Sequence, residues 1–185
     1  MKQFYKEKKS AGFTLTELLV VAAIISLMST LMLVNYRSGE RHFALQGSAH
    51  KLAQDLRRTE ELSMSLKEFQ GCFDPVPAGY GIYLKNGTPD EKKRYILFAD
   101  CKPGNQDYDP GSDGIVEEIS LERGVEISNL SPMAPDPKFS LVIVFTPPDP
   151  IVTINPSAFS AFITLTNNDQ TKTITVNKSG LITIE

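Results

Sequence analysis

The chain begins with a long apolar stretch that has no polar face. From Phe13 to Tyr36 the only charged residue is Glu17, and the run from Leu18 to Ile25 contains apolar side chains alone. An amphipathic surface helix would show polar residues on one side, so this pattern excludes one. A helix that spans a membrane needs about 20 mainly apolar residues. The pattern therefore predicts a transmembrane helix over residues 13–36.

The helical pattern continues after this stretch in a two-faced form. Over residues 37–70 apolar or small side chains recur at steps of three or four, with polar residues between them. The recurring positions are Leu45, Ala49, Leu52, Leu56, Thr59, Leu62, Leu66 and Phe69. The first proline is Pro75, so one helix is expected from about Phe13 to about Phe69, its second half amphipathic.

Residues 71–185 carry strand signals separated by turn residues. The segments GYGIYLKN and KRYILFAD predict neighbouring antiparallel strands, and Ile115–Leu121 predicts a third. The later segments KFSLVIVF, SAFITLT, KTITVN and GLITIE alternate β-branched and polar residues, which predicts a β-meander. A helix followed by strands favours an α+β fold, in which an antiparallel sheet covers the apolar face of the helix.

The distribution of charged residues predicts how the chain is oriented across the membrane. Residues 1–12 have a net charge of +3, from Lys2, Lys6, Lys8, Lys9 and Glu7. Because positive residues flanking a membrane helix stay inside, the N-terminus is expected in the cytoplasm and the part after Arg37 outside it. Without residues 1–12 the chain has 15 Lys and Arg against 21 Asp and Glu, a net charge of −6. This acidity disfavours nucleic acid as a partner.

A small residue precedes the apolar run instead of following it. An ordinary secretory signal is cut after its apolar core. Here Gly12 comes first, so a cut would remove the basic leader and keep the helix. The segment AGFTLTELLVVAAIISLM resembles the class III signal of type IV prepilins and type II secretion pseudopilins. The resemblance implies cleavage between Gly12 and Phe13 by a prepilin peptidase, N-methylation of Phe13, and an acidic fifth residue in the mature chain, Glu17.

Glu17 is costly where it lies, since a carboxylate in an apolar span costs about 2.5 kcal/mol or more and is usually retained for function. The span contains no Lys or Arg. The resemblance implies that the partner of Glu17 is the amine of Phe13 on a neighbouring subunit; the alternative is that Glu17 lies at the membrane interface and reaches water. The family often has a proline further along this helix, where this chain has Val34, and Gly39 is the candidate hinge.

The C-terminal strands carry a second resemblance. From the strand that ends at Phe145 to the segment around Gly180, their spacing resembles the head of H-type minor pseudopilins and related minor pilins. The resemblances imply a structural subunit of a type IV pilus or type II secretion pseudopilus, polymerised through its N-terminal helix. They also imply a location in the bacterial cytoplasmic (inner) membrane. The implied partners are other subunits, the prepilin peptidase and methyltransferase, the inner-membrane assembly platform and membrane lipid.

The alternative function is that of a minor or tip pilin whose head binds DNA, a surface or secreted cargo. An enzyme is not expected, because the sequence contains no Gly-x-Ser-x-Gly elbow, P-loop or His-Glu-x-x-His motif.

Two further sets of residues suggest local chemistry. Cys72 and Cys101 fall in the extracytoplasmic part, where a disulfide can persist; the alternative is two unpaired thiols. An acidic loop places Asp107, Asp109, Asp113 and Glu118 at roughly the spacing of a calcium-binding EF-hand, which makes Ca²⁺ the candidate cofactor. The alternative for this loop is a solvated turn, which uses the same residue types.

Overall fold

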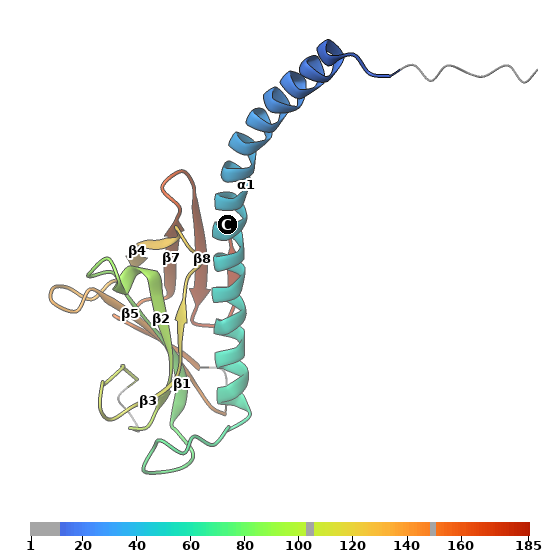
Figure 1. Cartoon of the computed structure of the whole chain (residues 1–185). Helices are drawn as coiled ribbons and strands as arrows, with labels where there is room; N and C mark the ends of the chain where they lie inside the picture. Colours follow the sequence, from blue (N-terminus) through green and yellow to red (C-terminus); the bar gives the residue numbers. More distant parts are fainter. Residues whose placement is uncertain (1–11, 103–105, 149–150) are drawn as a thin grey trace, which may run out of the picture. The chain divides into compact units, whose positions relative to one another are not determined.

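The computed structural model describes residues 12–102, 106–148 and 151–185, with the backbone alone at residues 33–38. The chain forms two compact units, one that ends at Glu40 and one from Arg41 to Glu185, here called the head. A single 50-residue helix, α1, runs from Leu15 to Met64 and contributes to both (Figure 1).

The helix ends in a Schellman motif, five residues before the predicted end at Phe69. The Lys67 N–H donates to the Leu62 carbonyl, and the Leu66 N–H donates to the Ser63 carbonyl. Leu66 adopts a left-handed conformation, with φ of 47°. Glycine usually occupies this position. The helix end predicted at Phe69 was wrong. The sequence does not mark the true end, because Leu66 stands where a glycine is usual.

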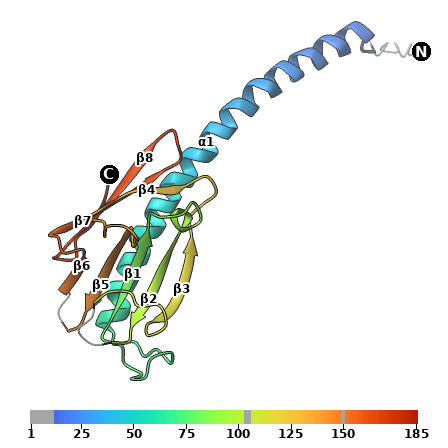
Figure 2. The same ribbon diagram turned by 90° about the vertical axis from the view of Figure 1, so that its left-hand side faces the viewer.

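The head contains two antiparallel sheets (Figure 2). The five-stranded sheet has the order β3-β2-β1-β5-β6, and the four-stranded sheet has the order β4-β7-β8-β9. The first comprises β1 (Gly79–Lys85), β2 (Arg94–Asp100), β3 (Gly114–Ser120), β5 (Ser140–Thr146) and β6 (Ile151–Asn155). The second comprises β4 (Glu126–Ser131), β7 (Ser160–Thr166), β8 (Thr171–Asn177) and β9 (Ile182–Ile184). A short 3₁₀ helix, η1 (Glu91–Lys93), precedes β2.

The predicted meander is correct for β7, β8 and β9 and wrong for β5. Strand β5 pairs with β1 and β6 in the other sheet. Its residues from Ser140 to Phe145 are all buried, as expected of a central strand covered on both faces. Strands β4 and β6 were not predicted: β4 is largely polar, and β6 lies between Pro148 and Pro156, which obscure its pattern.

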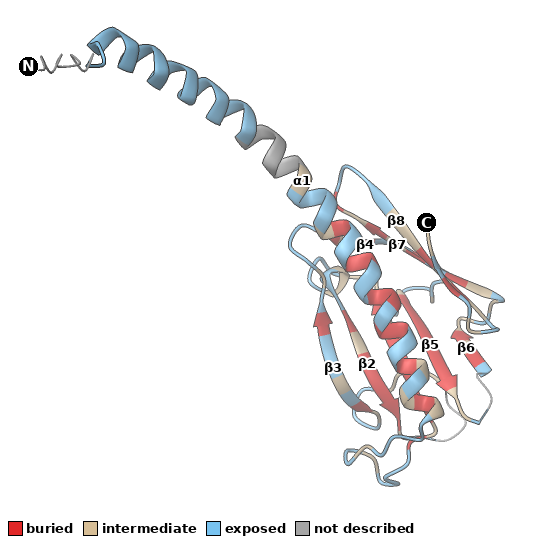
Figure 3. Cartoon of the chain, turned by 90° about the vertical axis from the view of Figure 1, so that its right-hand side faces the viewer, coloured by how far each residue is buried: buried red, intermediate tan, exposed pale blue. Residues whose placement is uncertain are grey.

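The core lies between the helix and both sheets, which confirms the α+β class. Within the head, one face of α1 is buried and the other is exposed (Figure 3). The buried apolar residues of the helix are Leu45, Ala49, Leu52, Ala53 and Leu56. They belong to one apolar cluster with strand residues of both sheets, such as Leu97 of β2 and Ile174 of β8. The predicted amphipathic stripe, from Leu45 to Thr59, is thus the surface on which the head is built, whereas Leu66 lies beyond the helix end and is 54% exposed.

Polar side chains on the same helix face bind the sheets at defined points. The Tyr95 hydroxyl donates to the Asp55 carboxylate at 2.5 Å, and the Ser63 hydroxyl donates to the Phe145 carbonyl at 2.5 Å. All of these groups are buried. A buried polar group without a partner costs about 1 to 3 kcal/mol, so these bonds fix the helix in one position against β2 and β5.

Candidate functional site

The predicted cleavage point lies in an exposed segment just before the helix. Gly12, Phe13 and Thr14 are not helical, and Phe13 is 84% exposed. A Cβ atom added at Gly12 would meet no atom within 4 Å. Peptidases act on exposed, unwound segments. The Gly12–Phe13 bond is therefore exposed and lies outside the helix.

Thr14 and Glu17 form a reciprocal capping box at the start of the helix. The Thr14 N–H donates to Glu17 Oε2 at 3.0 Å, and the Glu17 N–H donates to Thr14 Oγ1 at 3.3 Å. The Thr14 hydroxyl also donates to Glu17 Oε2 at 2.9 Å. The first N–H groups of a helix have no partner within the helix, and a box of this kind satisfies two of them. Glu17 therefore stabilises the start of its own helix.

The carboxylate of Glu17 is only partly used by this cap. Every hydrogen bond that it accepts within the described residues goes to Thr14. No Lys, Arg or His occurs between Gly12 and Met32, so this segment supplies no cation of its own. One carboxylate oxygen remains available to a positively charged group from another molecule.

The helix beyond Glu17 exposes apolar side chains in every direction. The window Leu15–Met32 has a mean hydropathy of 2.1, and none of it is buried within the chain. Leu18, Ile25 and Leu31 are each more than half exposed. By length and composition this segment can cross a membrane. Its apolar surface requires lipid or another protein as a covering.

Three hydroxyl groups in this segment are satisfied inside the helix. Ser26, Ser29 and Thr30 each donate to the carbonyl four residues earlier, at 2.8, 2.8 and 2.9 Å. Such bonds are an established way for Ser and Thr to occupy a helix interior. The hydroxyls therefore add little to the cost of placing the segment in lipid.

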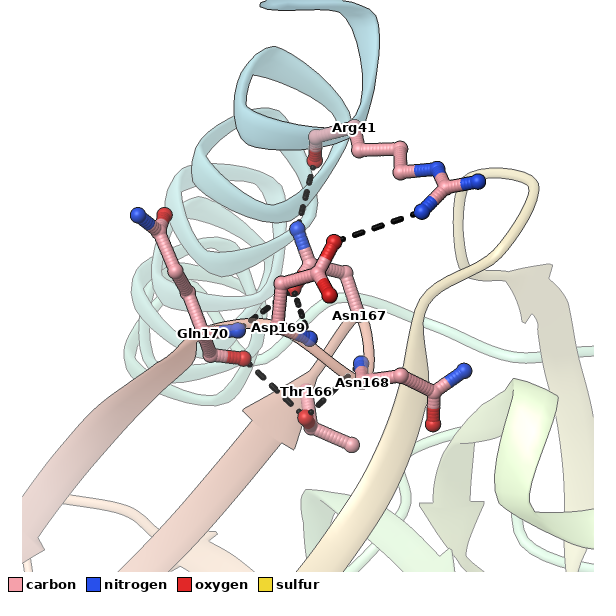
Figure 4. Close-up of polar contacts among 6 residues, drawn as sticks. All are labelled: Arg41, Thr166, Asn167, Asn168, Asp169 and Gln170. Carbon is pink, nitrogen blue, oxygen red and sulfur yellow. Dashed lines mark hydrogen bonds and ion pairs between the residues drawn. The ribbon is translucent and has the colours of Figure 1, made fainter. Parts of the chain in front are cut away.

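The β7–β8 turn holds the helix at the first residue of the head (Figure 4). The Asn167 amide donates to the Arg41 carbonyl at 3.0 Å, and its oxygen accepts the N–H groups of Asp169 and Gln170 at 3.1 and 2.8 Å. Asn167 is only 6% exposed, whereas the Arg41–Asp169 ion pair, at 3.3 Å, is largely exposed. A surface ion pair contributes little, so Asn167 is the main anchor of this contact.

Cys72 and Cys101 are joined by a disulfide, with their Cα atoms 5.1 Å apart. The bridge connects the loop after α1 to the residue that follows β2. It therefore fastens the end of the helix region to the five-stranded sheet.

The acidic loop uses its carboxylates as turn and surface partners. Asp113 accepts the Cys101 N–H at 3.2 Å through one oxygen and the Asp109 N–H at 2.7 Å through the other. Asp107 pairs with Lys138 at 3.1 Å.

The fourth candidate ligand, Glu118, lies on β3 and pairs with Arg94. Among the residues that the structure describes, no three His, Cys, Asp or Glu side chains are grouped so as to hold a metal ion. The predicted calcium ligands are thus not gathered into one group among the described residues.

Two residues of these sites were missed by the sequence reasoning. Thr14 could have been found, because Thr-x-x-Glu directly before an apolar run is a capping-box pattern. Asn167 begins an Asn-Asn-Asp turn, but the sequence does not indicate that its side chain reaches Arg41.

The N-terminal segment matches a known sequence motif. Residues 8–33 match the family model described as the prokaryotic N-terminal methylation motif. The resemblance of this segment to type IV pilin-like proteins is thereby confirmed.

The structure is similar to two crystal structures of the type IV minor pilin FimU from Pseudomonas aeruginosa (strain PAO1). One has 12% identity and a TM-score of 0.45, and covers 76% of this chain and 92% of that chain. The other has 14% identity and a TM-score of 0.46, and covers 76% and 87%. These likenesses are weak, and the fold is assigned from the helix and strands of the chain itself. A comparison with curated proteins finds no significant match.

Proposed function

We propose that this chain is a structural subunit of a type IV pilus or a type II secretion pseudopilus, without catalytic activity of its own. In this proposal a prepilin peptidase cuts between Gly12 and Phe13 and the new amine of Phe13 is methylated. The helix then holds the subunit in the cytoplasmic membrane, with the head outside, until the assembly platform adds it to the filament.

The observation that carries this proposal is the combination of an exposed Gly12–Phe13 bond with an uncovered apolar helix directly after it. A cut at this bond creates a positive amine next to that helix. A membrane anchor alone would require only apolar residues. A cut site directly before the anchor adds something to it only if the new N-terminus is used.

Glu17 is the partner that we propose for this amine in a neighbouring subunit. Its Oε2 atom accepts the cap bonds from Thr14, which leaves lone pairs on the carboxylate for a second donor. A charge buried between apolar helices is strongly destabilising unless its partner of opposite charge is present. The pair would therefore favour one axial register of each subunit against the next.

Processing is tested by expressing the full chain in a bacterium that contains a prepilin peptidase, followed by mass spectrometry of the purified protein. We expect an N-terminal methylated Phe13. An intact Met1, in cells that process a known prepilin made alongside, would refute the proposal.

Assembly is tested by separating the two roles of Glu17. Glu17→Gln keeps an oxygen that can accept the Thr14 N–H, since Glu and Gln both serve in a capping box, but it removes the charge. Thr14→Ala removes the cap and keeps the charge. We expect Glu17→Gln to be processed normally and to be absent from sheared filaments, while Thr14→Ala still assembles. Filaments containing Glu17→Gln at the normal level would contradict the role of the charge.

A further inference from the structure

The outer face of the five-stranded sheet, which faces away from the helix, carries a second and smaller apolar cluster. Phe98, Val142 and Val144 are buried there, with Tyr83 and Tyr108 packed against them. Tyr108 comes from the loop between β2 and β3, and its ring centroid lies 4.7 Å from that of Tyr83 and 5.0 Å from that of Phe98. Tyr83, Tyr108 and Ile96, which pack on this cluster, also line an open pocket of about 260 Å³.

Two ion pairs form the polar part of this pocket. Lys85 of β1 pairs with Glu91 of η1 at 2.6 Å, and Arg94 of β2 pairs with Glu118 of β3. Each cation is matched by one carboxylate, so the pocket has no net charge. A charged ligand would be attracted by one member of each pair and repelled by the other, so the pocket favours neither sign of charge.

The paired groups still have hydrogen-bonding capacity. A lysine ammonium has three donors, an arginine guanidinium has five, and a carboxylate has about four acceptor sites. Glu91 is held in place because it also accepts the Thr88 N–H at 2.8 Å, and the hydrogen bond from Lys85 lowers its pKa to about 2. A phenol is protonated at neutral pH, and burial raises the pKa of Tyr83 and Tyr108 further. The pocket therefore presents fixed donors and fixed acceptors side by side.

The loop that carries Tyr108 is held from both sides. The disulfide at Cys101 and the two bonds of Asp113 fix one part. Beside the ring, the Asp107 carboxylate accepts the Tyr108 N–H at 2.9 Å, and its ion pair with the largely exposed Lys138 adds little. A preorganised aromatic wall costs less entropy when a ligand binds. The aspartates of the acidic loop thus position Tyr108 over the sheet.

We propose that this pocket, lined by Tyr83, Tyr108 and the pairs Lys85–Glu91 and Arg94–Glu118, binds a neutral sugar unit of a glycan. The C–H face of a sugar ring is slightly positive and stacks on the negative face of an aromatic ring. Its hydroxyls both donate and accept, so they can bind each ion pair without separating it. A binding pocket commonly combines an aromatic lining with a few placed polar groups, and this one is smaller than the pockets of drug-sized ligands, as a single sugar unit requires. The proposal goes beyond filament assembly and does not depend on it.

The test uses the full chain in a polyoxyethylene detergent, because glucoside and maltoside detergents carry the proposed ligand themselves. The probes are methyl β-glucopyranoside, methyl β-galactopyranoside and N-acetylglucosamine. Their binding is measured by saturation-transfer NMR and by titration. At least one probe should bind saturably and should be insensitive to NaCl. Glucuronate and glucosamine, which carry charge, should bind more weakly than their neutral counterparts.

Variants locate the binding. Tyr108→Ala should weaken it about fivefold to tenfold, in line with the loss of one aromatic stacking contact, and Tyr108→Phe should retain most of it. Glu91→Gln should also weaken it, through the lost acceptor. Phe159→Ala is the matched control, since this ring is 85% exposed and lies outside the pocket.

The proposal is overturned if no neutral probe binds, or if an extended peptide binds the pocket and the sugars do not. It is also overturned if Tyr108→Ala and Glu91→Gln bind the sugars as the parent does, with circular dichroism showing that all three proteins are folded. Binding that disappears with added salt would overturn it too, because it would indicate a charged ligand. Processing and assembly of Tyr108→Ala should be normal, so failure of this proposal is distinguishable from failure of the assembly proposal.

Discussion

The disulfide between Cys72 and Cys101 allows the stability of the head to be worked out from chain entropy. The two cysteines are 29 residues apart in the sequence. In the loop-closure model, cross-linking residues at this separation removes entropy from the unfolded chain worth about 3.6 kcal/mol at 25 °C. A domain typically has a total stability of about 5 to 15 kcal/mol, so the bridge would supply a large share of it.

The measurement compares the fragment Arg41–Glu185, which is one compact unit, with its Cys72→Ser/Cys101→Ser variant. Urea unfolding followed by circular dichroism should give a free energy of unfolding lower by about 3 to 4 kcal/mol in the variant. For a head of this size that corresponds to a melting temperature lower by roughly 10 °C. The slope of the free energy against urea should be steeper in the variant, because its unfolded chain is less compact and exposes more surface.

The two readouts separate the explanations. A loss of stability with an unchanged slope would place the effect in the folded head, in lost contacts around Cys101, and would refute the entropic reasoning. A loss below about 1 kcal/mol would refute the magnitude as well. Reduction of the parent fragment should reproduce the variant, which controls for the serine substitutions.

Three other predictions concern the head. Tyr95→Phe should lower the free energy of unfolding by about 1.5 to 3 kcal/mol, because it leaves the buried Asp55 carboxylate without its donor, and Asp55→Asn should make the same change cost less in a double-mutant cycle followed by urea unfolding. Asn167→Ala should cost about 1 to 3 kcal/mol, because the Arg41 carbonyl loses a donor and two turn N–H groups lose their acceptor; full stability would contradict its role as an anchor. Burial raises the pKa of Asp100 from 3.8 to about 6, so the folded head binds this proton more tightly than the unfolded chain, and its contribution to stability should decline as the pH rises from about 4 to about 6; urea midpoints that show this slope equally in Asp100→Asn would contradict the assignment.

The elements that the sequence predicts well are those with a strong period or a strong apolar bias. The helix from Leu15 carries both signals, and most strands alternate clearly. The partition into two sheets was not predicted, because alternation reports which side of a strand is buried and does not report its neighbour. The continuous apolar run LVIVF of β5 does indicate a strand covered on both faces, and this run was interpreted as part of a meander.

The residues of the candidate site also differ in how well the sequence predicts them. The spacing of Gly12, Phe13 and Glu17 is local, so the sequence alone predicts it. The pocket on the outer sheet face depends on Tyr83 and Tyr108, which are 25 positions apart and meet only because the β2–β3 loop folds back over the sheet. The β2–β3 loop is rich in aspartate, as metal-binding loops are. Only the hydrogen bonds of these aspartates show that the loop is a turn that positions an aromatic ring.

The internal hydroxyl bonds of Ser26, Ser29 and Thr30 bear on how one helix can exist in two surroundings. Each hydroxyl already has an acceptor in its own backbone, so these groups would need no partner helix if the segment lay alone in lipid. Each hydroxyl can also turn to a neighbouring helix and exchange one bond for another of similar strength. Transfer between a membrane reservoir and a packed bundle would then be close to neutral at these three positions.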